Sequence, residues 1–192
     1  LKLFTKKPYN VSFPLFISAI ALTTWCLLRV VLTLQVGLTQ MELSEILGVF
    51  CKGLWFDIAA LGYLIVPWLL IHALLPNRLS SKPWLNKARW IMAFLVTFGL
   101  IFGAVSEFIF WQEFTTRFNF IAVDYLIYTN EVIGNIRESY PVPLILLAIA
   151  LIVLGILFAL SKLVRFDVQP KPTKKKFGLL FDLLYSRFEG GL

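Results

Sequence analysis

The chain has 192 residues, of which 59% are hydrophobic and only 15% charged, so its polar surface is too small to cover a water-soluble globule. Its net charge of +7 comes from Lys and Arg that cluster beside long apolar runs, which is the pattern of membrane proteins. The composition therefore predicts an integral membrane protein with phospholipids around it, and no nucleic-acid partner.

The apolar runs predict an all-α fold, a polytopic transmembrane helix bundle with interfacial amphipathic helices beside it. Several runs reach the roughly 20 helical residues that cross a bilayer. We expect four spans, at residues 13–34, 46–75, 88–111 and 142–163, within one membrane domain over residues 1–165. The second run is longer than a bilayer requires, which predicts a tilted or partly interfacial helix.

The segment 112–140 joins the third and fourth spans, and its charged and apolar residues recur at regular spacing. Arg117, Asp124, Glu131 and Glu138 recur every seven residues, and apolar side chains recur at near-helical spacing between them. The pattern predicts one or two amphipathic helices that lie at the outer interface. An ordinary helical hairpin that packs on the bundle fits the same pattern.

Residues 166–192 are expected to form a basic linker and then an amphipathic segment on the cytoplasmic side. The linker holds the Lys174–Lys176 cluster, and the segment that follows, 177–192, is too short and too charged to span. The chain begins at Leu1 without Met. The sequence therefore predicts a fragment at the N-terminus, and residues 166–192 are separately expected to begin a truncated region.

Loop charges predict the orientation of the spans. Basic residues stand before the first span, between the second and third, and after the fourth, whereas residues 36–45 hold Glu42 and Glu45 and no Lys or Arg. Because Lys and Arg stay on the cytoplasmic side, we expect a cytoplasmic N-terminus and C-terminus. Residues 36–45 and 112–140 are then outside.

Charged residues within the predicted spans are the strongest functional signal, because a charge at mid-helix costs about 2.5–3.5 kcal/mol on insertion. At 1.5 Å per residue, Arg29, Asp57 and Glu107 all fall in the outer half of the membrane. Arg29 could neutralise Asp57 or Glu107, either as a packing salt bridge or as a polar pocket at the depth of lipid head groups. The candidate residues of this layer and its outer border are Arg29, Lys52, Asp57, Glu107, Arg117, Asp124, Glu131, Arg137 and Glu138.

No motif of a catalytic or metal site accompanies these charges. The chain has one histidine and no nucleophile elbow, phosphate-binding loop or dinucleotide fingerprint, so we expect neither a catalytic residue nor a metal in it. Gly99 and Gly103 lie on one face of the third span, where a partner helix could approach closely.

A resemblance to a known family rests on two stretches. The block from Arg117 to Pro141, RFNFIAVDYLIYTNEVIGNIRESYP, resembles the membrane region of lipoteichoic-acid-synthase-like proteins of Gram-negative bacteria, which belong to the sulfatase and alkaline phosphatase superfamily. The run GLWFD, from Gly53 to Asp57, is similar to the same family. The resemblance covers roughly residues 45–165.

The resemblance implies a two-part enzyme in the bacterial inner membrane. In this family, about five membrane helices precede an extracytoplasmic α/β domain that uses a threonine nucleophile and a divalent metal. That domain moves a phosphoglycerol or phosphoethanolamine head group onto a glycan or lipid acceptor. None of its catalytic residues maps onto this chain, and the four predicted spans leave the C-terminus inside, where the family has a fifth span. Whether the chain belongs to an enzyme is therefore open.

Two functions follow as expectations. In the first, the chain is the lipid-access region of a head-group transferase, with Arg29, Asp57, Glu107 and the segment 117–138 at the lipid. In the second, it is a small non-catalytic membrane protein that acts as a scaffold or lipid-binding factor. A transporter fits less well, because the charges crowd toward one face of the membrane and not toward its middle.

Overall fold

The computed structural model describes residues 9–37, 41–74, 83–119, 134 and 136–166. Along these ranges the chain forms β1 (Tyr9–Val11), α1 (Phe13–Val36), α2 (Leu43–Leu74), α4 (Pro83–Phe114), α7 (Val142–Leu163) and β2 (Val164–Phe166). The predicted interfacial helices between α4 and α7 lie largely outside the described residues, as do residues 167–192. The expected all-α bundle is confirmed.

Four helices of the described ranges are long and apolar enough to cross a membrane, as the apolar runs predict. They cover Phe13–Val36, Leu43–Ile71, Trp84–Phe114 and Val142–Leu163. The last begins and ends where the sequence places it. The second and third begin before the predicted positions, because each of these helices has a polar first turn that precedes the apolar run from which a span is predicted.

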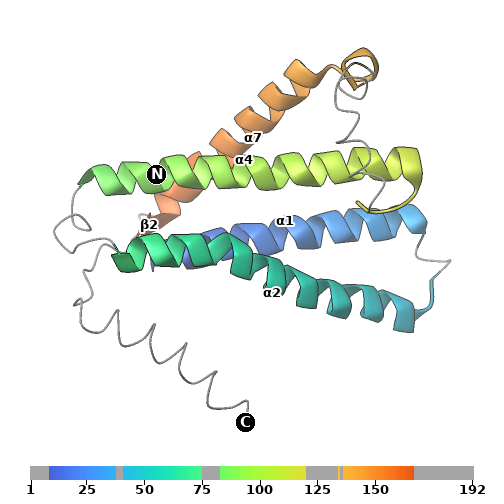
Figure 1. Ribbon diagram of the computed structural model, residues 1–192, viewed down its shortest axis with the longest axis horizontal. Coiled ribbons are helices and arrows are strands. Elements are labelled where there is room, and N and C mark those ends of the chain that lie inside the picture. The colour runs from blue at the N-terminus through green and yellow to red at the C-terminus, as the bar shows by residue number, and fades with distance from the viewer. Residues whose placement is uncertain (1–8, 38–40, 75–82, 120–133, 135, 167–192) are drawn as a thin grey trace, which may run out of the picture.

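Consecutive helices run in opposite directions along the bundle (Figure 1). Helix α1 lies at the centre of the arrangement and packs against both α2 and α4, and α7 packs against α4. From its contact with α4, α7 diverges toward the end of the bundle where α1 ends at Val36 (Figure 1). The helices therefore lie closest together at one end of the bundle and spread at the other.

A short parallel pairing of β1 with β2 ties the start of α1 to the end of α7, and the sequence did not predict it. Tyr9 is opposite Val164, and Val11 is opposite Phe166. We call this pair the clasp and the end of the bundle that holds it the clasp end. The opposite end, where α1 and α4 end and α2 and α7 begin, is the open end.

Aromatic side chains fill the core beside the clasp. The Phe166 ring lies with its centroid 5.4 Å from that of Phe13, 5.2 Å from Phe16 and 4.8 Å from Trp90. Phe13 also contacts Trp68 of α2 at 4.2 Å. Edge and tilted contacts at these distances are the arrangements that aromatic rings favour. One residue of β2 therefore joins α1, α4 and the clasp in a single cluster.

Candidate functional site

The first part of the candidate site is a buried ion pair between α1 and α2. Nη2 of Arg29 donates hydrogen bonds to both carboxylate oxygens of Asp57, at 3.0 and 2.9 Å. The two side chains are only 6% and 13% exposed. Since a lone charge in a membrane helix is expensive, this pairing is what allows both residues to lie within the bundle.

Gly53 makes room for the guanidinium. It lies one turn before Asp57 on α2, so the two residues share the face that meets α1. A Cβ at position 53 would overlap Cζ, Nε and Nη2 of Arg29. The Phe50 ring lies one turn further back, with its centroid 6.0 Å from Cζ of Arg29, close enough for a cation–π contact. Arg29 therefore lies in a slot that α2 shapes for it.

The second part is an ion pair at the open end of α4. Nε of Arg117 donates to Oε1 of Glu107, ten residues earlier. Thr115 takes a left-handed backbone conformation, with φ of 52°, which turns the chain back after Phe114 and brings Arg117 toward Glu107. The Glu107 side chain is 14% exposed and that of Arg117 is 54% exposed. This pair is therefore open to molecules around the bundle on its cationic side.

A hydrogen bond that the sequence pattern did not indicate lies beside this pair. The Tyr140 hydroxyl, just before α7, donates to Oε1 of Glu113 on α4 at 2.7 Å. This hydrogen bond, helped by partial desolvation and by the carboxylate charge, raises the pKa of Tyr140 above its ordinary value near 10. The contact spans 27 residues, so neither residue's neighbours in the sequence could have pointed to it.

The predicted polar layer is thus divided into two pairs. Of the two partners open to Arg29, the structure selects Asp57, and Glu107 pairs with Arg117. Lys52 is exposed on α2, outside the slot.

The remaining candidates lie at the outer border of the layer. Arg137 and Glu138 are exposed in the short helical turn before α7. Asp124 and Glu131 lie outside the described residues.

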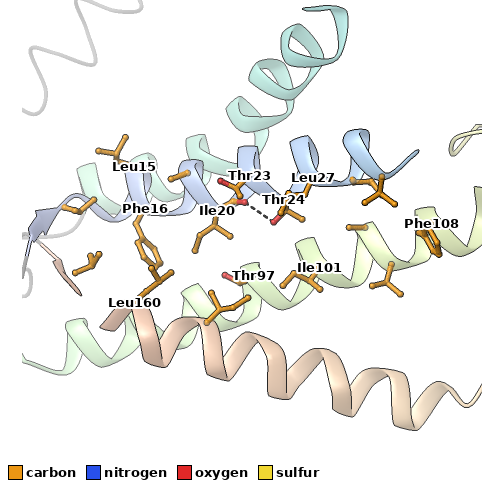
Figure 2. A pocket seen from close by; sticks show the side chains of 18 residues that line it. Leu15, Phe16, Ile20, Thr23, Thr24, Leu27, Thr97, Ile101, Phe108 and Leu160 are labelled. Carbon is orange, nitrogen blue, oxygen red and sulfur yellow. Dashed lines mark hydrogen bonds between the residues drawn. The ribbon is translucent and has the colours of Figure 1, made fainter. Parts of the chain in front are cut away.

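An apolar groove runs along α1 and α4 (Figure 2), and no charged residue lines it. It has a volume of about 780 Å³. Its polar side chains are Thr23, Thr24 and Thr97, and the hydroxyl of Thr24 donates to the backbone carbonyl of Ile20 at 2.9 Å. Thr97 is 1% exposed, and its hydroxyl has no hydrogen-bond partner among the described residues. The lining is therefore almost wholly hydrocarbon.

The face of α4 that holds Gly99 and Gly103 and the possible metal ligands complete the description of the site. Nothing in the described part of the chain lies within 4 Å of a Cβ added at Gly99 or Gly103, so a helix that uses this face would have to come from elsewhere. Within the same ranges, no group of three His, Cys, Asp or Glu residues could hold a metal ion.

The chain was compared with protein-family models, with curated proteins and with solved structures, and none of them matches it. The resemblance to lipoteichoic-acid-synthase-like proteins therefore rests on the two quoted stretches of sequence.

Proposed function

We propose that this chain is the membrane-anchoring, lipid-access region of an extracytoplasmic transferase of phosphoglycerol or phosphoethanolamine head groups. The observation that carries the proposal is the position of two ion pairs in the open half of a membrane bundle. Arg29 and Glu107 each lie seven residues before the ends of their helices, at Val36 and Phe114, or roughly 10 Å along the helix axis. Both pairs therefore lie in the half of the membrane that is nearer the open end.

The charge distribution supports an extracytoplasmic open end. Among the described residues, the clasp end carries the cations Lys87, Arg89, Lys162 and Arg165 and no carboxylate. A cationic end of this kind is typical of the cytoplasmic side of a membrane protein. Under the proposal, the N-terminus is cytoplasmic in a bacterial inner membrane, and the two ion pairs are on the outer side.

The chemical step would belong to a separate domain, which would also supply the divalent metal. Under the proposal, the part of the described side chains is to anchor the enzyme and to hold the donor lipid. Arg117 is suited to the second task, because a half-exposed guanidinium can hydrogen-bond phosphate oxygens with the nitrogens that Glu107 leaves unused.

A non-catalytic scaffold or lipid-binding protein is the second candidate function. The burial of the Arg29–Asp57 pair favours it, because a pair that is only 6% and 13% exposed can fix the packing of α1 on α2 without meeting any ligand. The two functions differ in whether head-group transfer requires these residues.

The test begins with the native gene product, which is extracted from its own membranes and whose intact mass is measured by mass spectrometry. A mass well above 22.0 kDa, together with release of a head group from a labelled phospholipid, supports the transferase. A mass near 22.0 kDa would contradict the transferase proposal and favour the scaffold function. In an active protein, Glu107→Gln and Arg117→Gln should lower transfer, whereas Lys52→Gln, which changes an exposed cation outside both pairs, serves as the control.

A further inference from the structure

Helix α2 consists of two parts that meet at a bend. Figure 1 shows that α2 changes direction along its length and that the part beginning at Leu43 leads away from α1. Pro67 lies inside the helix, where it has no N–H to donate to the carbonyl of Tyr63 and its ring crowds that carbonyl. Sharp bends in helices are almost always found at such prolines. We call residues 43–62, on the open-end side of the bend, the arm.

The part of α2 on the clasp side of the bend is held by the core. The ring centroid of Trp68 lies 4.2 Å from that of Phe13 on α1. Leu64 and Trp68 both pack against the buried cluster that contains Phe13, Phe16 and Phe166. Several side chains at once therefore fix this part of α2 relative to α1 and the clasp.

The polar contacts between the arm and α1, in contrast, all belong to one side chain of α1. Asp57 accepts both of its hydrogen bonds from Arg29. Gly53 leaves the space in which the guanidinium lies, and the Phe50 ring centroid is 6.0 Å from its Cζ atom. Among the described residues, no other hydrogen bond or ion pair joins the arm to α1. Arg29 therefore holds three successive turns of the arm.

Apolar contacts do not replace Arg29 in this role. In a bilayer the hydrophobic effect does not drive helices together, because lipid chains are as apolar as the side chains, so helices associate through close packing and polar contacts. The large apolar side chains of the arm are turned outward: Trp55 is 73% exposed and Phe56 is 72% exposed. Nowhere between residues 43 and 71 does α2 hold a fully buried side chain. The position of the arm therefore depends on the ion pair.

We propose that α2 is a hinged helix, in which the arm turns about the bend at Pro67 and the Arg29–Asp57 pair holds it on α1. While the pair is intact, the arm stays in place. When the pair is broken, the arm moves away from α1 and opens the space between the two helices to the membrane, and the contact of Trp68 with Phe13 keeps the clasp side fixed. The inference goes beyond the proposed function and applies equally to an enzyme and to a scaffold.

Two natural cysteines allow the motion to be measured. Cys26 on α1 and Cys51 on the arm are both exposed, so each can carry a nitroxide spin label. The full-length native protein, with cysteines kept only at these two positions, is reconstituted into lipid nanodiscs, and pulsed electron paramagnetic resonance measures the distance between the labels. At 1.5 Å per residue, Cys51 lies about 24 Å along the helix from Pro67. A change of about 20° in the bend would then move the label by roughly 8 Å.

The double variant Arg29→Met with Asp57→Leu removes the pair without leaving an unpaired charge in the bundle. We expect the single narrow distance of the wild type to broaden or to shift by roughly 8 Å. Adding Pro67→Ala, at an exposed position, should narrow the distribution again, because alanine supplies the missing N–H and continues the helix. The matched control is Val66→Ala at the exposed neighbouring position, which should leave the distribution broad.

A second pair of labels reports on the clasp side of the bend. Leu15→Cys on α1 and Leu70→Cys on α2 are exposed positions, and the distance between their labels should be the same in every variant. If the double variant leaves the distance between positions 26 and 51 unchanged, the ion pair does not hold the arm. Equal effects of Pro67→Ala and Val66→Ala would show that the motion is not at the proline. A change between positions 15 and 70 would show that α2 moves as one piece, and each of these results would overturn the proposal.

Discussion

The two ion pairs of this bundle combine the same kinds of groups in opposite surroundings. Arg29 and Asp57 meet between two helices, in a slot that Gly53 leaves open, and both are nearly buried. Glu107 and Arg117 meet at the end of one helix, where the guanidinium is 54% exposed. A buried pair is costly to break and a poor partner for a ligand, whereas an exposed pair contributes little to stability and can exchange partners. We therefore assign packing to the first pair and lipid contact to the second.

The largest expected effect comes from removing one partner of the buried pair. Asp57→Leu should lower the free energy of unfolding in mixed micelles by about 3–5 kcal/mol, because it leaves the Arg29 charge inside the bundle without a counter-charge. The double variant Arg29→Met with Asp57→Leu should regain most of that loss. A double variant as unstable as Asp57→Leu alone would contradict this explanation.

A smaller loss is expected when the slot is filled. Gly53→Ala places a methyl group where the Arg29 guanidinium lies, and overpacking of this kind costs about 1–3 kcal/mol. The matched control is Gly62→Ala on the same helix, where nothing described lies within 4 Å. It should be neutral or slightly stabilising, since alanine favours helix over glycine. Equal effects of the two substitutions would show that the slot has no energetic role.

The exposed pair should respond weakly in stability. Arg117→Gln is expected to change the free energy of unfolding by about 0.2–1 kcal/mol, and the change should shrink in high salt. Head-group transfer or lipid retention should fall much more than stability does. A loss of stability as large as that of Asp57→Leu would remove the contrast between the two pairs.

The smallest effect is a pH dependence at the open end. Because Glu113 raises the pKa of Tyr140, the contact stabilises the fold below the ordinary tyrosine pKa near 10 and is lost as pH rises through the higher pKa of the folded state. Phenolate absorbance, taken as the difference between wild type and Tyr140→Phe, should titrate above pH 10. Glu113→Gln should move that titration downward. A titration that Glu113→Gln leaves unchanged would show that the contact does not form in solution.

Part of the candidate site followed from residue types alone. Arg29, Asp57 and Glu107 stand out in apolar runs, so their cost in lipid predicts that each has a partner. The choice of partner did not follow, because Arg29 and Asp57 are 28 residues apart and meet only through the rotation of α1 and α2 about their axes. The contact between Glu113 and Tyr140 gave no signal either, since both lie in polar segments where charge and hydroxyl groups are ordinary.

By itself, the sequence determined that this is a membrane protein and where the four long helices of the described ranges lie, because a bilayer imposes a local requirement of about 20 apolar residues in helical form. Tertiary structure alone decided what joins these helices. The clasp pairs residues 9–11 with 164–166, Gly53 receives a side chain from α1, and the groove exists because α7 diverges from its neighbours. Each of these depends on how whole helices are rotated and tilted, and neither hydropathy nor periodicity records that information.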